Sequence, residues 1–128
     1  MRFLLDTHSF LWFVTGDYHF SRIAEAAIVD PENEIFLSPA SYWELAIKVS
    51  LGKYQLNVPF ETFITRAVKE NQFSILPVQP QHAAIVSELP FYHRDPFDRL
   101  IIAQAISEQL MVISADQALD DYIVSRLW

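Results

Sequence analysis

Four carboxylates in this sequence stand where regular elements are expected to begin or end. They are Asp6, Glu44, Asp98 and Asp116. A cluster of carboxylate oxygens is a hard-ligand site of the kind that Mg²⁺ and Mn²⁺ prefer. Two such ions can clamp the attacking and the leaving oxygen when a phosphodiester is hydrolysed. Whether the four side chains can meet depends on the elements that carry them.

The apolar pattern alternates between short β-rich runs and longer helical runs. Strands are expected over Arg2–Leu5, Glu34–Leu37, Ser74–Val78 and Leu110–Ser114. Helices are expected over about 8–14, 22–29, 39–51, 59–71, 80–89 and 96–109, with a short helix or turn from Ala115 to the C-terminus. This alternation of near-continuous apolar strands with helices predicts a three-layer α/β/α fold whose short central parallel sheet has four to five strands. No repeat or linker interrupts it, so residues 1–128 are expected to form one domain.

The expected topology brings three of the carboxylates to one edge of the sheet. In an open parallel sheet, ligands bind outside the carboxyl ends of the strands. Asp6 follows the first strand, and Asp116 lies shortly beyond the fourth. Glu44 lies in the second turn of the helix after the second strand, which begins at the same edge in a right-handed crossover. Asp98 joins them only if its helix also begins there, which the order helix–strand does not require.

Each of these carboxylates also has a purely structural interpretation. Asp6 could cap the helix that follows it, and Glu44 could pair with Lys48 four residues later. Asp116 could be an ordinary turn residue. Taken together these interpretations are weaker, because four like charges at one edge repel one another unless a cation lies between them.

The segment HRDPFDRLIIAQA, residues 93–105, places two aspartates before an uncharged run. Asp95 is expected to be the N-cap of a helix, with Pro96 at the first helical position and Asp98 at the third. This is the capping-box spacing with aspartate in place of glutamate. Asp98 then remains as the candidate ligand, held by a buried helix behind it.

Three cationic or titratable side chains could contact a substrate beside the carboxylates. Arg94 and Arg99 could each pair with a nearby aspartate or contact a phosphate, for which a guanidinium is well suited. His8 lies close enough to Asp6 in the chain to touch a substrate. The histidines show no zinc-ligand spacing such as HExxH.

Composition excludes several classes of protein. The chain has no cysteine, which excludes a disulfide framework, a thiolate metal site and a cysteine nucleophile. With two glycines and neither GxGxxG nor a Walker loop, the sequence argues against dinucleotide binding and P-loop chemistry. No apolar stretch reaches the ~18 residues of a membrane span, and Asp6 interrupts the apolar N-terminus before any cleavage site. A soluble cytoplasmic protein is expected.

The net charge of −7 at first argues against a nucleic-acid substrate, because an acidic chain repels phosphates. The four candidate carboxylates account for −4 of this charge and leave −3 for the rest of the chain. Two divalent cations would neutralise the site locally. The acidity of the whole chain therefore says little about phosphate binding.

Four segments of the sequence resemble the PIN-domain family and, within it, the VapC-type toxins of bacterial toxin–antitoxin systems. They are LLDTHSFLW, SPASYWELAIKVSLGK, HRDPFDRLIIAQA and VISAD, which together span Leu4 to Asp116 in the expected order. The resemblance implies that the acidic quartet Asp6, Glu44, Asp98 and Asp116 binds Mg²⁺ or Mn²⁺ and activates water for endonucleolytic cleavage of RNA.

The resemblance also implies supporting residues and partners. Thr7 and Ser114 match positions where the family often has a hydroxyl beside the metal, which would orient the carboxylates. A homodimer and a cognate antitoxin that occludes the groove are implied as well.

Two other functions are consistent with parts of the pattern. A phosphatase or phosphotransferase could use Asp6 as its nucleophile, but that pattern requires a second aspartate two residues later, where this chain has His8. A non-catalytic binding module on a decayed nuclease fold is the other alternative. Decay would be expected to remove a carboxylate, and none is missing.

Overall fold

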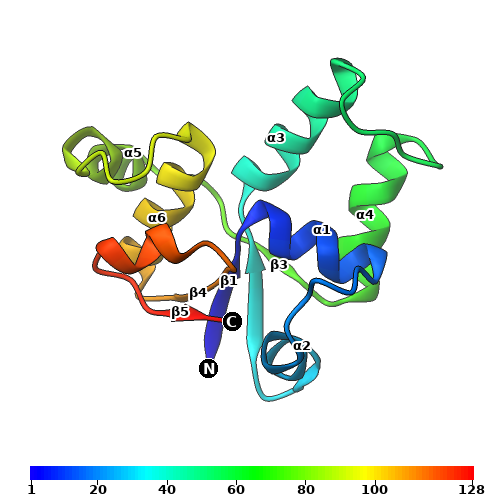
Figure 1. The fold of residues 1–128 in the computed structure, drawn as a ribbon, viewed down its shortest axis with the longest axis horizontal. Helices are drawn as coiled ribbons and strands as arrows, with labels where there is room; N and C mark the ends of the chain where they lie inside the picture. The colour runs from blue at the N-terminus through cyan, green and yellow to red at the C-terminus, as the bar shows by residue number, and fades with distance from the viewer.

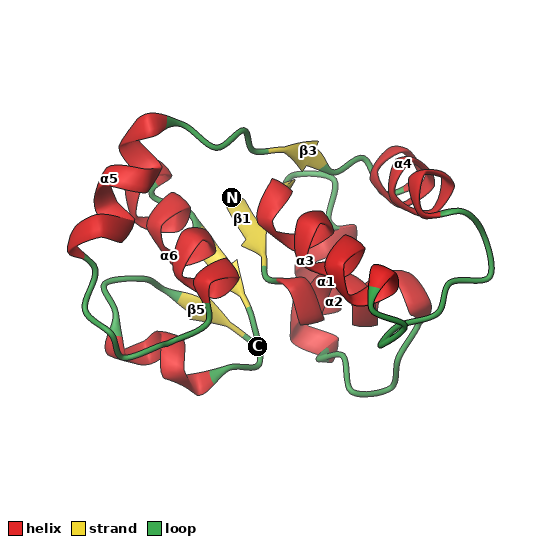
Figure 2. Cartoon of the chain, turned by 90° about the horizontal axis from the view of Figure 1, so that it is seen from above, coloured by secondary structure: helices red, strands yellow, loops and turns green.

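The computed structural model describes residues 1–128, in which a parallel sheet lies between two groups of helices (Figures 1 and 2). The strands are β1 (Arg2–Leu5), β2 (Glu34–Leu37), β3 (Ser74–Ile75), β4 (Met111–Ile113) and β5 (Arg126–Leu127). The helices are α1 (Thr7–Thr15), α2 (Arg22–Val29), α3 (Pro39–Ser50), α4 (Phe60–Glu70), α5 (Pro80–Glu88), α6 (Pro96–Glu108) and the 3₁₀ helix η1 (Gln117–Asp121). The strand order is β3-β2-β1-β4-β5, and all neighbouring strands are parallel.

The sheet has an apolar core on each face, because successive side chains of a strand point to opposite sides. On β1, Phe3 and Leu5 join one core cluster together with side chains of α1, α2 and α4. Leu4 joins a second cluster together with side chains of α6 and η1. Figure 1 shows these two groups of helices on opposite sides of the strands. None of the helices is long and apolar enough to cross a membrane.

The predicted three-layer α/β/α fold is confirmed, and two details of the sheet differ from the expectation. The third strand ends earlier, at Ile75, because Pro77 follows soon after and has no N–H to donate to the sheet. The fifth strand, which the predicted range of four to five strands allowed, lies near the C-terminus, where a short helix or turn was expected. Two backbone hydrogen bonds, from Val112 to Ser125 and from Ser114 to Leu127, add it beside β4.

The carboxyl edge of the sheet is the place where the chain repeatedly leaves a strand and enters a helix. Helices α1 and α3 begin there, and η1 follows β4 at the same edge. Helix α6 also begins at this edge, as shown by the contact that His93, just before it, makes with Asp116 after β4. The condition for Asp98 to join the other carboxylates is therefore met.

Candidate functional site

Asp6 is fixed by hydrogen bonds at both of its carboxylate oxygens. Its Oδ1 accepts from the backbone N–H of Ser9, 2.8 Å away, which makes Asp6 the N-cap of α1. Its Oδ2 accepts from the hydroxyl of Ser114, which is fully buried after β4. Burial raises the pKa of the Asp6 carboxyl, although these hydrogen bonds oppose the rise. Asp6 is thus both a cap and a buried, rigidly oriented carboxylate.

Glu44 reaches the same edge from α3. The side chain is only 7% exposed, and its Oε2 lies 3.2 Å from the Nζ of Lys48, so the expected pairing is present. Thr7 does not contact a carboxylate. Its hydroxyl donates to the Oγ of Ser41 over 3.2 Å, which joins the first turn of α1 to the first turn of α3. This bond fixes the two helices that carry Asp6 and Glu44 against each other.

Asp95 is the N-cap of α6, as its position in the sequence predicts. Its Oδ1 accepts from the backbone N–H groups of Phe97 and Asp98 at 2.8 and 3.2 Å. The second half of the predicted capping box is different. The backbone N–H of Asp95 donates to Nδ1 of His93 and not to the Asp98 carboxylate, which leaves Asp98 directed toward the other acids.

His93 joins Asp98 to Asp116. Because its Nδ1 accepts the N–H of Asp95, the proton of the neutral ring is on Nε2. This Nε2 lies 3.2 Å from Oδ2 of Asp98 and 2.8 Å from Oδ2 of Asp116. Asp116 meanwhile caps η1, since its Oδ1 accepts from the N–H of Ala118. The three ligating groups of His93, Asp98 and Asp116 lie within 4.8 Å of one another.

The electrostatics of Asp98 link it to Asp6 and Glu44. Burial raises the pKa of Asp98 to about 7, and the negative charges of Asp95, Asp6 and Glu44 add to the rise, while His93 opposes it. A divalent cation among these oxygens would remove the repulsion that disfavours the ionised carboxyl. The donor set, mainly carboxylate oxygens, fits Mg²⁺ or Mn²⁺.

Arg99 is part of the interior and forms no ion pair with Asp98. It is 5% exposed, and its two terminal nitrogens donate to the backbone carbonyls of Val86, Leu89, Pro90 and His93. The ring of Phe91 covers the guanidinium at 3.9 Å. Arg99 therefore neither pairs with an aspartate nor faces the solvent, where it could contact a phosphate. Arg99 holds the segment that carries His93.

Tyr122 holds the same segment from η1. Its hydroxyl donates to the carbonyl of Pro90 at 2.6 Å and accepts the backbone N–H of His93 at 2.7 Å. The residues before α6 therefore have fixed partners on both sides. This places the His93 ring where it meets the two carboxylates.

The other two candidate substrate contacts, Arg94 and His8, are both exposed to solvent. His8 lines a hollow of about 310 Å³ together with Asp6, Trp12, Ala115 and Asp116. A substrate in this hollow would lie against two of the candidate carboxylates.

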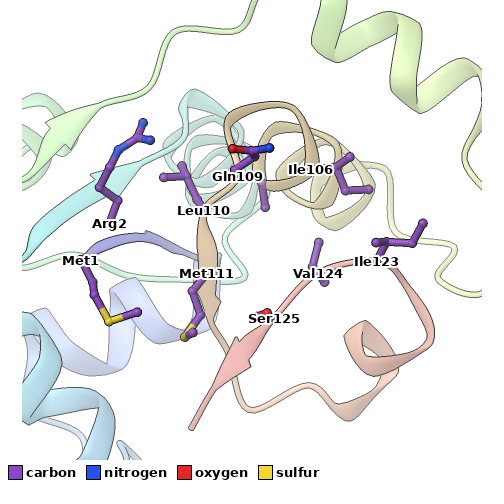
Figure 3. Close-up of a pocket in the computed structure, with 10 residues that line it drawn as sticks. Met1, Arg2, Ile106, Gln109, Leu110, Met111, Ile123, Val124 and Ser125 are labelled. Carbon is purple, nitrogen blue, oxygen red and sulfur yellow. The ribbon is translucent and has the colours of Figure 1, made fainter.

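A larger hollow, of about 570 Å³, lies at the opposite edge of the sheet and has different chemistry. Figure 3 shows its lining, which includes Met1 and Met111 at the amino ends of β1 and β4 and Ile123 after η1. Its lining is mostly apolar and holds no carboxylate. This hollow therefore lacks the carboxylates that a hard-cation site requires.

The comparison with protein families identifies the family of this chain. The family model of the PIN domain matches residues 3–123. The chain belongs to the PIN-domain family. Ribonuclease VapC22 of Mycobacterium tuberculosis is similar to this PIN domain, with 28% identity over 117 residues that cover 91% of this chain and 88% of that protein.

Solved structures share the fold at lower sequence identity. VapBC2 of Rickettsia felis, bound to a DNA fragment from its promoter, has a TM-score of 0.75 at 14% identity and covers 100% of this PIN domain and 99% of its own chain. The DNA-bound VapBC of Salmonella typhimurium has a TM-score of 0.68 at 16% identity and covers 99% of this chain and 97% of its own. FitAcB of Neisseria gonorrhoeae has a TM-score of 0.65 at 22% identity, with 98% and 96% covered.

Sequence reasoning missed three residues that shape the site in this PIN domain. His93, Ser41 and Tyr122 are not among the candidate site residues predicted from the sequence. The one signal in the sequence was the position of His93 two residues before the predicted N-cap, where a ring nitrogen can accept the cap's N–H.

The division of roles between the two aspartates of the 93–105 segment predicts different effects of mutation. Asp95→Ala should lower the free energy of unfolding by about 1 kcal/mol, because two N–H groups of α6 lose their acceptor. Nuclease activity should stay within a few-fold of the wild type. Urea unfolding and a cleavage assay on the same sample test both. A stable but inactive Asp95→Ala would show that Asp95 belongs to the ligand set.

Proposed function

We propose that this protein is an endoribonuclease dependent on Mg²⁺ or Mn²⁺, and that it is the toxin of a toxin–antitoxin pair. The observation that supports this most directly is the shared electrostatics of Asp98, Asp6 and Glu44 at the carboxyl edge of a PIN fold. Asp116 joins the group through His93. The negative charges of these carboxylates repel one another, and a cation between them would remove that repulsion.

The candidate ligands would be Asp6, Glu44, Asp98 and Asp116. When bound, the cations supply Lewis acidity to the scissile phosphate and lower the pKa of an attacking water. The chain's own contribution is orientation. Ser114 and the N–H of Ser9 fix the two oxygens of Asp6, and the N–H of Ala118 fixes one oxygen of Asp116. Rigid ligands of this kind set the geometry of the site.

The relatives support an antitoxin as the partner. The similar structures from Rickettsia felis and Salmonella typhimurium are VapBC complexes, and the similar protein from Mycobacterium tuberculosis is named a ribonuclease. We propose an RNA substrate in the cytoplasm, a homodimer, and a cognate antitoxin that covers the carboxylate edge until it is removed.

The alternative of an Asp6 nucleophile has less support from the sequence. That pattern requires a second aspartate two residues after the nucleophile, and this chain has His8 there. A phosphorylated Asp6, detected by mass spectrometry after incubation with a phosphate ester, would favour that alternative.

The purified protein should cleave RNA in the presence of Mg²⁺ or Mn²⁺, and EDTA should stop the reaction. Re-addition of the metal should restore it, and Asp6→Asn should stay inactive under all conditions while its circular dichroism spectrum remains that of a folded protein. A gel assay on labelled RNA measures this. Full cleavage in EDTA would refute the metal site.

The wild type and Asp6→Asn also test the toxin role separately from the nuclease activity. Expression of the wild type should arrest growth, co-expression of the cognate antitoxin should restore growth, and Asp6→Asn should be harmless. A wild type that cleaves RNA in vitro without arresting growth would contradict the toxin role and leave the nuclease intact.

A further inference from the structure

The hollow beside the carboxylates has an aromatic wall as well as an acidic one. Its five lining residues are Asp6, His8, Trp12, Ala115 and Asp116. His8 and Trp12 lie one turn apart on α1, with ring centroids 5.8 Å apart and planes inclined by 49°. The lining of the hollow therefore combines two carboxylates with two adjoining aromatic rings.

The Trp12 ring is held in place from outside the hollow. The ring of His19 stacks on it at 5.4 Å with an interplanar angle of 26°, and the ring of Trp128 lies at 5.8 Å. Asp17 in turn fixes His19, since its Oδ1 accepts the backbone N–H of His19 and lies 2.7 Å from the ring Nδ1. A side chain fixed on several sides loses little entropy when a ligand stacks on it.

The stack continues away from the carboxylates. Tyr18, which is 88% exposed, lies against His19 with ring centroids 4.1 Å apart. Trp12 and Tyr18 also line a second hollow of about 420 Å³, so Trp12 separates the two hollows. An exposed series of stacked rings thus begins at the acidic site and runs outward along the surface.

We propose that the hollow formed by His8 and Trp12 is a nucleobase subsite, in which a base of single-stranded RNA next to the scissile phosphate stacks on these rings. Proteins that bind single strands use aromatic platforms in this way, because every base presents a π-face. The hollow is large enough for one base, and it adjoins the carboxylates that would bind the phosphate. The subsite rests on the proposed ribonuclease activity.

The lining of the hollow indicates how such a subsite would bind. The hollow has no arginine or lysine in its lining. Affinity for the base is therefore expected to come from stacking and not from the release of counterions. The contribution of Trp12 is therefore expected to change little with salt.

The test compares Trp12→Leu with Trp12→Phe in the cleavage of a short single-stranded RNA. Trp12→Leu should raise KM by on the order of tenfold or more and leave kcat nearly unchanged, while Trp12→Phe, which keeps a π-surface, should stay within about threefold. The ratio of KM values between Trp12→Leu and the wild type should be the same at low and moderate salt. A fall in kcat with an unchanged KM would overturn the subsite.

A substrate series gives a second measurement that does not depend on the folding of any variant. Wild-type protein is assayed with RNAs that carry one abasic nucleotide at each position in turn. One position should raise KM as much as Trp12→Leu does, and at that position Trp12→Leu should add nothing further. If every abasic substrate behaves like the intact RNA, the subsite does not exist.

Two further comparisons identify what the surface binds. Trp43, which lies on α3 and is 61% exposed, is the matched control tryptophan. If Trp43→Leu raises KM as much as Trp12→Leu does, the effect cannot be assigned to this hollow. If Trp12→Leu weakens the antitoxin and leaves the KM for RNA unchanged, the surface is a protein-binding surface and the subsite is refuted. A wild type that cleaves no RNA refutes the proposed function itself, which is a separate result.

Discussion

Asp98→Asn is expected to reduce RNA cleavage by roughly 100-fold or more and, at the same time, to stabilise the metal-free protein above pH 7. Both effects have the same cause. Burial and the charges of Asp95, Asp6 and Glu44 make the ionised carboxyl of Asp98 unfavourable, which is reflected in its pKa of about 7. An amide has no charge to bury, but it also binds a divalent cation poorly.

The sign of the pH dependence follows from the direction of this shift. The folded pKa is about 7 and the ordinary value is 3.8, so the native state holds the proton more tightly than the unfolded chain. The stability that this group contributes is complete below about pH 4 and is lost as the pH rises through about 7. At pH 8 the asparagine variant should therefore be more stable than the metal-free wild type, by about 2 kcal/mol after allowance for solvent screening.

Chemical unfolding at pH 5 and pH 8, with EDTA and with Mg²⁺, measures this difference. Mg²⁺ should stabilise the wild type at pH 8 and have little effect on Asp98→Asn, because only the wild type has the full ligand set. Glu88→Gln, which removes an exposed carboxylate on α5, is the matched control and should follow the wild type throughout. Equal stability of Asp98→Asn and wild type at pH 8 would contradict the proposed electrostatics.

The carboxylates could be found from the sequence because their structural and functional roles coincide. Asp6 caps α1 and Glu44 pairs with Lys48, as the structural interpretations predict. Asp116, which was expected to be a turn residue, caps the 3₁₀ helix η1. Each of these contacts uses one side of a carboxylate and fixes its direction. Local signals such as caps and i,i+4 pairs therefore also located the residues that gather at the sheet edge.

The same local signals predicted most of the fold, since apolar runs and helix starts depend on neighbouring residues. They failed where a partner far along the chain decides the outcome. Strand β5 has two residues and exists because β4 offers it hydrogen bonds. The segment before α6 has no periodicity, so the placement of His93 could not be inferred. It depends on Tyr122, which is 29 residues away.

Arg99 is the clearest case of a residue whose role only the structure shows, and Arg99→Met should be severely destabilising. Four backbone carbonyls, of Val86, Leu89, Pro90 and His93, would lose a charged donor in a buried region. We expect a loss of on the order of 4 kcal/mol in the free energy of unfolding, because leaving buried polar groups unpaired costs about 1–3 kcal/mol each and some of them will reach water. This corresponds to a fall in Tm of about 15 °C.

Arg99→Lys and Arg94→Met make this prediction specific. Lysine keeps the charge, but its single ammonium cannot span carbonyls on both sides as the planar guanidinium does, so Arg99→Lys should lie between wild type and Arg99→Met. Arg94 is an exposed arginine in the same segment, and its loss should change stability by no more than about 0.5 kcal/mol. If Arg99→Met is as stable as Arg94→Met, the buried guanidinium does not hold this segment. If Arg99→Met is instead less stable than Arg94→Met, the positions of His93 and of the neighbouring Asp98 carboxylate depend on Arg99, although Arg99 itself touches neither metal nor RNA.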